Sequence, residues 1–361
     1  MITSVSVKNY RGIKSCKVEN LKNVNVFIGR NNSGKSSFLE SLYLASAAFS
    51  FEEKLFNDKI NNKIDYLLNR RCFRNYTWDT AKEVLWYEYN TDVPISANIK
   101  INSKNLEIKL VNWFQYPVLK FEINECTHKY INLRSPHLLD ITSKSFVTIT
   151  PDSKSQFVKI YEKEIKFFSN ARFIDDTLLR EMDIVEKRLW NSLLKKRYDK
   201  LVVEVLREGY EVEVEDLTYT TYDDGKTYQL AVKLPWTSLR VDDLGDGARY
   251  AILLIMVAAL SKDTILLIEE PENHQHPAGL LRTLKMFLHL VKKNNIQTFI
   301  TTHSLEFIKL LQKTAEDKKV DVGVYFFERE KDGSIDVREI TRENMEVLEK
   351  LGLDPRFLDL I

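Results

Sequence analysis

The residues from Gly29 to Ser36 have the types and the spacing that bind the phosphates of a nucleotide. The pattern Gly29-x-x-x-x-Gly34-Lys35-Ser36 matches the phosphate-binding P-loop. Its two glycines let the backbone curl so that successive N–H groups point at phosphate oxygens. Lys35 supplies a positive charge for the β- and γ-phosphates, and the Ser36 hydroxyl is a hard oxygen ligand for Mg²⁺. The pattern therefore predicts a site for a nucleoside triphosphate.

Two carboxylates at the end of an apolar run supply the groups that hydrolysis needs. The run Thr264–Ile268 leads directly into Glu269 and Glu270, as in a buried parallel strand whose carboxyl end delivers acids to a crevice. We expect Glu269 to bind magnesium and Glu270 to orient or deprotonate the attacking water. The alternative is a strand that merely ends in two solvated acids, and the P-loop in the same chain disfavours it.

A second apolar run, Ile296–Thr302, ends at His303 and predicts an imidazole at the same crevice edge. There it can hydrogen-bond a γ-phosphate or its water, although a lone histidine in such a place is more often structural. His274 and His276 have no further Cys or His nearby, so we expect polar loop residues there rather than a metal site.

A pair of glycines, Gly245 and Gly247, precedes the almost entirely apolar run Ala251–Leu260. A helix that is apolar all round is buried, and its N-terminus can bind an anion where it reaches the surface. Taken alone, a glycine-rich helix start is common and is a weak signal.

These groups need a strand before the P-loop, a helix after it, and further strands for the acids and the histidine. Residues Val24–Ile28 predict the strand, and apolar positions at helical spacing predict the helix from Gly34 to about Ala48. This flanking order argues against a chance loop rich in Gly, Asn and Ser. Residues 176–207 predict one amphipathic helical stretch. Further predicted strands are Val84–Tyr89, Ile95–Ile101, Leu106–Val111, Val118–Ile123, Tyr210–Leu217, Thr227–Leu234, Val322–Glu328 and Ile335–Ile340.

The composition is that of an ordinary soluble protein. Of the 361 residues 44% are apolar and 29% are charged, and the net charge of +1 provides no global field toward nucleic acid or membranes. The three cysteines are scattered without a paired motif, which favours reduced thiols. The longest apolar run, Ala251–Leu260, is too short to span a membrane, and no signal peptide is evident. We expect a cytoplasmic location and no membrane contact.

In this order, the segments resemble the ABC-type ATPase heads of the SMC, RecF and OLD families. The similar segments are Ile2–Ile13 (N-terminal strand and turn), Gly29–Ser37 (Walker A), Leu244–Ala248 (the abbreviated signature of OLD-like ATPases), Ile265–Pro271 (Walker B with the catalytic Glu), the residues up to Pro277 (D-loop) and Thr302–Ser304 (switch histidine). Two departures are the Glu269 that stands where many relatives have Asp, and the absence of the usual Ser before the signature glycines.

The resemblance implies an α/β fold of the P-loop NTPase type. Its core, a mixed or parallel sheet flanked by helices, would comprise residues 1–50 and 236–361. A β-rich insertion would occupy 51–170, and a helical lobe 171–235. The resemblance also implies a head-to-tail homodimer, in which ATP and Mg²⁺ bound by one subunit are capped by the signature of the other, and hydrolysis releases the clamp.

The resemblance assigns the roles as follows. The catalytic residues would be Glu270, His303 and Lys35. The magnesium ligands would be Ser36, Glu269 and a glutamine, either Gln115 or Gln156, of which we take Gln156 because it is nearer to the buried strand expected around Phe168–Ile174. The signature acting in trans would be Leu244, Gly245, Asp246 and Gly247. The ATP-binding residues would be Gly29, Arg30, Asn31, Asn32, Ser33, Gly34, Lys35, Ser36, Ser37 and Arg11.

Three functions are compatible with these motifs. The first is a stand-alone ATPase whose dimerisation acts on a separate effector protein, because we expect neither a TOPRIM nuclease domain nor a long coiled coil. The second is an ATP-gated DNA clamp with slow hydrolysis, which the low net charge places second. The third, a transporter motor, is disfavoured by the Asn9–Gly12 turn and the β-rich insertion. The basic residues that motivate the DNA clamp are Arg70, Arg71, Lys195, Lys196 and Arg197.

Overall fold

The computed structural model divides the chain into two compact units. It describes residues 1–53, 55, 62–70, 76, 78–112, 118–124, 127–132, 161–210, 213–221 and 228–350. The first unit contains Met1–Lys54, Ile60–Arg172 and Gly323–Ile361, and the second contains Leu55–Lys59 and Phe173–Val322. The grouping of residues 1–50 with 236–361, apart from 51–170 and 171–235, stays a prediction.

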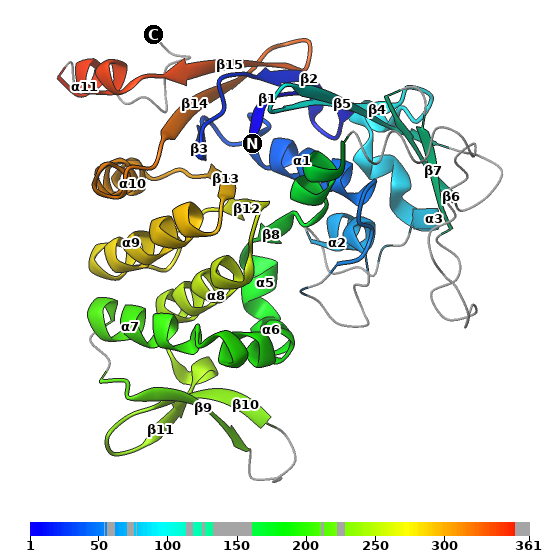
Figure 1. The fold of residues 1–361 in the computed structure, drawn as a ribbon. Helices are drawn as coiled ribbons and strands as arrows, with labels where there is room; N and C mark the ends of the chain where they lie inside the picture. The colour runs from blue at the N-terminus through cyan, green and yellow to red at the C-terminus, as the bar shows by residue number, and fades with distance from the viewer. Residues whose placement is uncertain are drawn as a thin grey trace. The chain divides into compact units, whose positions relative to one another are not determined.

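The first unit is built on a mixed sheet that takes strands from both ends of its sequence (Figure 1). The strand order is β7-β6-β5-β4-β1-β2-β15-β14-β3. Strand β15 pairs with β2 in parallel, whereas the pairs β1–β2, β1–β4, β4–β5, β5–β6, β6–β7 and β14–β15 are antiparallel. The strands are β1 (Ile2–Tyr10), β2 (Ile13–Val18), β3 (Val24–Ile28), β4 (Ile95–Ile101), β5 (Lys104–Asn112), β6 (Val118–Ile123), β7 (Thr127–Asn132), β14 (Val322–Arg329) and β15 (Ser334–Ile340).

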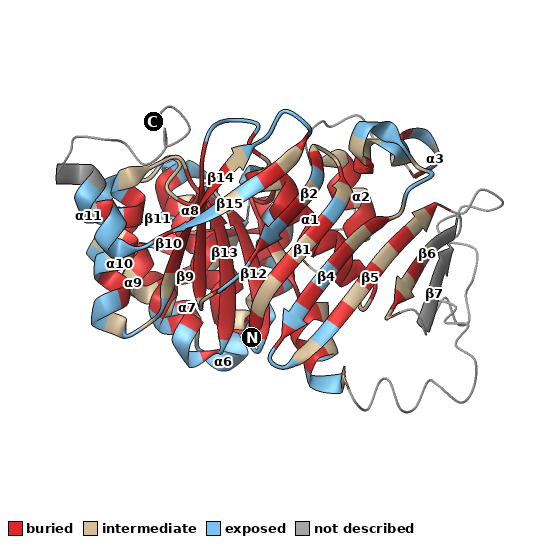
Figure 2. Ribbon diagram, turned by 90° about the horizontal axis from the view of Figure 1, so that it is seen from above, coloured by how far each residue is buried: buried red, intermediate tan, exposed pale blue. Residues whose placement is uncertain are grey.

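Alternation of apolar and polar residues gives the outer strands of this sheet one buried face. Strand β4 buries every second residue from Ile95 to Ile101, and β5 repeats the pattern, as Figure 2 shows. Strand β3 is buried at every position, which is typical of a strand covered on both faces. Helix α1 (Lys35–Ala47) contacts β1, β2 and β4. Further helices of this unit are α2 (Lys63–Asn69), α3 (Trp78–Ala81) and α11 (Arg342–Lys350), and residues 161–169 are also helical.

The predicted strand Val84–Tyr89 is wrong. Residues Lys82–Leu85 and Tyr87–Tyr89 form the 3₁₀ turns η1 and η2 instead. Leu85 and Trp86 are consecutive and both fully buried, whereas a strand sends consecutive side chains to opposite faces. The indole N–H of Trp86 donates to the carbonyl of Val93 (3.0 Å). Tertiary packing of one large side chain therefore overrides the local β preference.

The second unit contains the strand order β13-β12-β8. Strands β12 (Thr264–Glu269) and β13 (Ile296–Thr301) pair in parallel, so Glu269 stands opposite Thr301 where both strands end. Strand β8 is Arg172–Ile174. Strands β12 and β13 are buried over almost their whole length (Figure 2), as the apolar runs predicted.

Helices of the second unit pack around α9 (Pro277–Lys293), which contacts α7, α8, α10 and β13 (Figure 1). The others are α5 (Asp176–Arg180), α6 (Met182–Lys196), α7 (Asp199–Gly209), α8 (Asp246–Leu260) and α10 (Leu305–Lys318). The single helical stretch predicted over 176–207 is thus three helices, broken at Glu181 and at Arg197, whose φ of 57° is left-handed. Of the helices that the structure describes, none is long and apolar enough to cross a membrane.

A separate antiparallel sheet in the second unit has the order β11-β10-β9. Its strands are β9 (Asp216–Thr221), β10 (Tyr228–Lys233) and β11 (Ser238–Arg240), followed by the 3₁₀ turn η3 (Val241–Asp243). The prediction of a strand from Tyr210 was wrong, because α7 continues to Gly209 and the strand begins only at Asp216.

Helix α6 buries the carboxyl group of Glu186 against β10, where it accepts a hydrogen bond from the N–H of Leu230 (2.9 Å). Burial raises the pKa of Glu186 to about 7, although the Leu230 hydrogen bond opposes the rise. Because the pKa in the folded state lies above that of an unfolded glutamate, the stabilising contribution is complete below about pH 4 and is lost as the pH rises through about 7.

We therefore expect Glu186→Gln to flatten the decrease of the unfolding free energy between about pH 4 and pH 7. Urea unfolding at several pH values measures this slope, and the exposed Glu213→Gln should leave it as in the wild type. Equal slopes for the wild type and Glu186→Gln would contradict the prediction.

Candidate functional site

The P-loop joins β3 to α1 in the first unit, as predicted. Gly29 and Gly34 have φ angles of 136° and 97°, which L-residues rarely adopt. A Cβ atom on Gly29 would also lie 2.4 Å from the carbonyl oxygen of Phe327 in β14. The curl of the loop and its closeness to β14 therefore both require glycine at this position.

An aromatic cluster fixes the strand before the loop to the helix after it. The ring centroids of Phe27 and Phe38 are 5.2 Å apart, and that of Phe327 lies 5.0 Å and 5.6 Å from them. All three side chains are fully buried or nearly so. Because the rings meet edge-on or tilted, as aromatic pairs prefer, they hold the start of α1 in place.

The ammonium group of Lys35 lies inside the loop. Its Nζ donates to the carbonyl oxygens of Gly29 (2.9 Å) and Arg30 (2.8 Å), and Lys35 is only 5% exposed. Ser36 is half-buried in the first turn of α1. The loop thus gathers a cation, a hydroxyl group and a helix N-terminus, which together suit an anionic phosphate. Of the other predicted ATP-binding residues in the loop, Ser33 and Ser37 are buried, whereas Arg30, Asn31 and Asn32 are exposed.

Arg11, which we expected to contact ATP, takes part in a buried charge cluster. Its Nε lies 3.0 Å from Oε2 of Glu40 in α1, and its Nη2 donates to the carbonyl of Leu67 (2.6 Å). Arg70 donates to the other oxygen of Glu40, and the hydroxyl of Tyr10 lies 3.3 Å from Oε2. Burial acts to lower the pKa of Arg11, but the Glu40 carboxylate and the Tyr10 hydroxyl outweigh this effect, so the pKa is raised. Contact of Arg11 with ATP stays a prediction.

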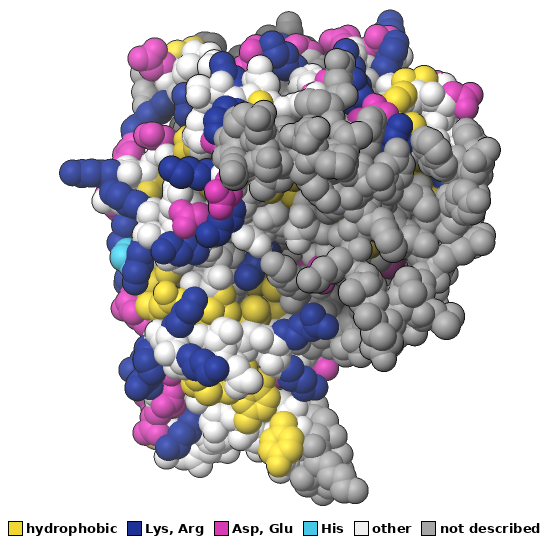
Figure 3. Space-filling view, turned by 45° about the vertical axis from the view of Figure 1, so that its right-hand side comes forward, with side chains coloured by type: hydrophobic (Ala, Val, Ile, Leu, Met, Phe, Trp, Pro, Cys, Tyr) yellow, Lys and Arg dark blue, Asp and Glu magenta, His cyan; other side chains and the backbone are white. Residues whose placement is uncertain are grey.

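The basic residues that motivated a DNA clamp differ in their surroundings. The side chain of Arg70 is only 5% exposed and is held by Glu40, so it is not part of a basic surface. Lys195, Lys196 and Arg197, at the end of α6, are exposed. Figure 3 shows Lys and Arg side chains spread over the visible described surface, with Asp and Glu among them. Residues that lie outside the described part of the chain are Arg71, Gln115 and Gln156.

In the second unit, the structure brings Glu270 and His303 together. The N–H of Glu270 donates to the carbonyl of Thr301 (2.9 Å), so the last link between β12 and β13 includes this residue. Oε2 of Glu270 accepts a hydrogen bond from the Asn273 amide (2.9 Å), while Oε1 lies 3.8 Å from Nε2 of His303. The Glu270 and His303 side chains are about 40% exposed, so both are accessible. The backbone of Glu270 is left-handed, with φ of 45°, which costs energy in a non-glycine residue.

A third acid, Glu272, lies beside this pair and was not among the predicted site residues. Glu272 accepts hydrogen bonds from the Thr302 hydroxyl and from the N–H of His303 (3.3 Å). Burial raises the pKa of Glu272, and the Thr302 hydrogen bond acts against it. The only sequence signal was its place two residues after Glu270 in the Glu-Glu-Pro-Glu run.

The predicted signature forms the start of α8, which is tied to the end of β12. A Cβ atom on Gly247 would lie 2.5 Å from the carbonyl oxygen of His274, and the hydroxyl of Tyr250 donates to the carbonyl of Glu269 (3.3 Å). Gly247 is therefore required by the loop packed against it. At Gly245, by contrast, no described atom beyond its own stretch of the chain lies within 4 Å of where a Cβ would stand. Of the other two signature residues, Leu244 is half-buried and Asp246 is exposed.

His276 has a structural role, because it caps α9: its Nδ1 accepts the N–H of Ala278 at 3.3 Å. Within the described ranges, no three His, Cys, Asp or Glu side chains gather as a metal-binding group. The predicted magnesium ligands Ser36 and Glu269 offer a hydroxyl and a carboxylate, which are the hard oxygen donors that this ion prefers. These residues fit Mg²⁺ in their chemistry.

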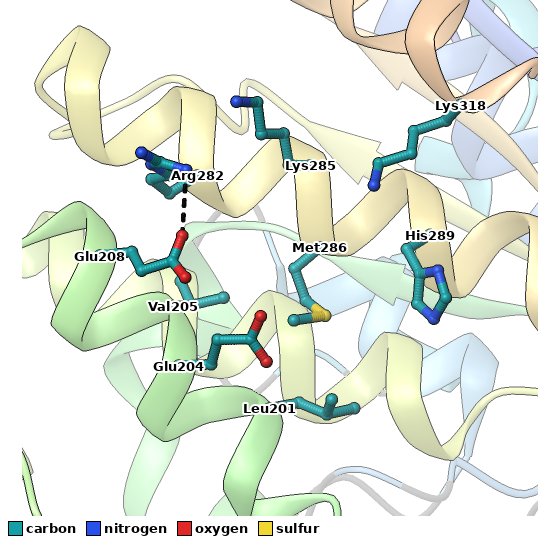
Figure 4. Close-up of a pocket in the computed structure, with 9 residues that line it drawn as sticks. All are labelled: Leu201, Glu204, Val205, Glu208, Arg282, Lys285, Met286, His289 and Lys318. Carbon is teal, nitrogen blue, oxygen red and sulfur yellow. Dashed lines mark ion pairs between the residues drawn. The ribbon is translucent and has the colours of Figure 1, made fainter.

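A groove with a volume of about 370 Å³ lies elsewhere in the second unit (Figure 4). One helical stripe of α7 and one of α9 form its walls, with Arg282 and Glu208 paired at 3.0 Å across it. None of the predicted site residues lines this groove. Its lining consists of Leu201, Glu204, Val205, Glu208, Arg282, Lys285, Met286, His289 and Lys318.

A phosphate-binding loop after one strand, and an acid and a histidine after two parallel strands, are the features of a P-loop ATPase. The sequence profile of the AAA ATPase domain family matches residues 1–230 and 189–308. The chain belongs to this family.

Individual known proteins support the same class. The chain is 23% identical over 338 residues to an ATP/GTP phosphatase of Helicobacter pylori, which covers 88% of this chain and 89% of the relative. It is 28% identical over 118 residues to the DNA replication and repair protein RecF of Francisella tularensis subsp. novicida, covering 31% of this chain and 33% of that protein. A crystal structure of an SMC head bound to the C-winged helix domain of ScpA matches over 95% of this chain and 99% of that chain, with a TM-score of 0.50 and 11% identity. The predicted α/β fold and the SMC/RecF-like ATPase class are confirmed.

Proposed function

We propose that this ATPase is a switch that closes as a head-to-tail homodimer around ATP and Mg²⁺ and acts on a separate partner protein. The observation that carries the hydrolytic part is the juxtaposition of Glu270 and His303 at the carboxyl ends of β12 and β13. Ligands and catalytic groups of α/β proteins gather at such strand ends. The Helicobacter pylori relative, an ATP/GTP phosphatase, supports hydrolysis of a nucleoside triphosphate.

Each residue has a defined task in this proposal. Lys35 and the N–H groups of the P-loop hold the phosphates, and Ser36 and Glu269 would hold Mg²⁺, which neutralises phosphate charge when bound. Glu270 accepts a proton from water as the water oxygen bonds to the γ-phosphorus and the bond to ADP breaks. His303 donates a hydrogen bond to the γ-phosphate from its place beside the Glu270 carboxylate.

The dimeric part of the proposal rests on Gly245. Packing within the chain explains why residue 247 must be glycine, but it does not explain the glycine at 245. A side chain at Gly245 would meet no neighbouring segment, and its φ of −61° is one that any residue adopts. A glycine that the fold itself does not require is suited to a place where another molecule approaches the backbone closely. In the proposed dimer, that neighbour is the ATP held by the P-loop of a second copy. The SMC head was solved with a ScpA domain bound, and by analogy we propose a separate protein as the target of the switch.

Complementation between two inactive variants tests whether the site is shared between two chains. Lys35→Ala damages phosphate binding in the P-loop, and Gly245→Glu places a carboxylate where the capping glycine would meet phosphate. We expect each variant alone to hydrolyse ATP at background rate. An equimolar mixture should recover about a quarter of the wild-type activity, because half of the dimers are mixed and each has one intact site of two.

The steady-state rate of phosphate release, measured at concentrations where the wild type is dimeric with ATP, gives the result. A mixture of Lys35→Ala with the doubly substituted Lys35→Ala/Gly245→Glu chain is the matched control and should show no recovery. Absence of recovery in the first mixture would mean that each chain forms its site alone.

A further inference from the structure

The carboxyl group of Glu272 bridges the loop after β12 and the segment after β13. One of its oxygens, Oε1, accepts both the hydroxyl of Thr302 and the N–H of His303, the latter at 3.3 Å. A single side chain thus holds the residue before the imidazole and the backbone of the imidazole's own residue. Its hold is independent of the β ladder, whose last link is the N–H of Glu270 to the carbonyl of Thr301.

The bridge continues into the start of α10. The Thr302 hydroxyl, while donating to Glu272, accepts the N–H of Ser304 (2.9 Å). Ser304 is in turn the N-cap of α10, and its hydroxyl accepts the N–H of Phe307 (3.0 Å). Polarised hydrogen bonds in such a chain strengthen one another. Hydrogen bonds therefore hold the residues on either side of His303, Thr302 and Ser304, and this chain of bonds ends at the Glu272 carboxylate.

The loop that holds Glu270 and Glu272 contains two features that lower the stability of the fold. Among the described residues, nothing offers a hydrogen bond to the buried Oε2 of Glu272. A buried polar oxygen without a partner lowers stability, and most native carboxylates avoid it. Glu270, two residues earlier, also has a left-handed backbone. Costly features of this kind concentrate at functional sites, where the surrounding structure maintains them.

We propose that Glu272 is a positioning residue for ATP hydrolysis, which holds Thr302 and the backbone of His303 so that the imidazole faces the Glu270 carboxylate. The proposal rests on the hydrolytic roles given above to Glu270 and His303. The imidazole nitrogen is 3.8 Å from the Glu270 oxygen, so a shift of about 1 Å in the held segment changes whether the two groups interact. Glu272 thus affects the chemical step and leaves nucleotide binding, which belongs to the P-loop, unchanged.

The test is a double-mutant cycle between Glu272 and His303. We expect Glu272→Ala to lower kcat for ATP by up to about 10²-fold, with little change in KM, because misplacement by about 1 Å has effects of this size. In a His303→Ala background the same substitution should have no further effect, because the group that it positions is gone. Thr302→Val, which removes one donor and keeps the side-chain shape, should lower kcat in the same way and also lose its effect without His303.

A matched control is Glu306→Ala, which removes an exposed acid from the first turn of α10 and should leave kcat unchanged. If Glu272→Ala does not fold, as judged by circular dichroism, the Thr302→Val cycle decides the question. Equal losses with and without His303, or wild-type kcat in Thr302→Val, would overturn the positioning role. A wild-type kcat in His303→Ala itself would be a different result. It would contradict the role of His303 in the proposed function, and not only the positioning role of Glu272.

Discussion

Replacing Glu270 by glutamine should lower the rate of ATP hydrolysis by about 10²- to 10⁴-fold, because an amide cannot accept the proton of the attacking water. The amide is close in shape to the carboxylate. Its oxygen can still accept the hydrogen bond that Asn273 donates at 2.9 Å, so the loop after β12 should keep its conformation. ATP binding should be preserved, because the P-loop residues that hold the phosphates are untouched. The ATP-bound form should therefore accumulate.

Single-turnover release of phosphate measures the chemical step, and light scattering with and without ATP measures the proposed dimer. The control is Glu330→Gln, which neutralises an exposed carboxylate between β14 and β15 and should hydrolyse ATP at the wild-type rate. Hydrolysis by Glu270→Gln at the wild-type rate would exclude Glu270 as the base. Loss of ATP binding together with hydrolysis would indicate a structural role instead.

The elements that carry the predicted site were predictable because their signals are local. A β-branched apolar run, two glycines at fixed spacing and an apolar helix leave few alternatives, and β3, α1, β12 and β13 form where the sequence placed them. The juxtaposition of Glu270 with His303 followed from one rule, that parallel strands end at one edge. Helix ends that no glycine or proline marks were less predictable. Arg197 ends α6 in a left-handed conformation that sequence patterns assign to glycine.

Polar residues that act on one another across the fold could not be found from sequence. Arg11 and Arg70 were assigned to ATP and to DNA, because a lone arginine in a sequence carries no sign of its partner. The structure pairs both with Glu40, a residue that the helical pattern of α1 left unremarked. Glu272 was missed for the same reason, since its partners Thr302 and His303 are distant in sequence. Local propensity and periodicity carry no information on such pairings.

The second large effect is expected at Glu40, whose side chain is fully buried between two guanidinium groups. The side chains of Arg11 and Arg70 are 10% and 5% exposed, so Glu40 compensates the charge of two buried cations. Removing one member of a buried ion pair costs about 3–5 kcal/mol, because the partner charge stays buried without compensation. Glu40→Ala should lower the unfolding free energy by an amount in this range, and with two cations affected we expect the upper end.

Urea unfolding measures this loss, and an exposed ion pair of the same unit provides the control. Lys14 and Asp332 lie 3.3 Å apart with side chains that are 50% and 58% exposed, so Lys14→Ala should lower the unfolding free energy far less than Glu40→Ala does. A loss below about 1 kcal/mol in Glu40→Ala would show that water reaches the two arginines once the carboxylate is gone. Because Glu40 lies in the helix that begins with Lys35 and Ser36, the same variant should also weaken ATP binding. The buried cluster would then be what keeps the P-loop helix anchored to the turn between β1 and β2.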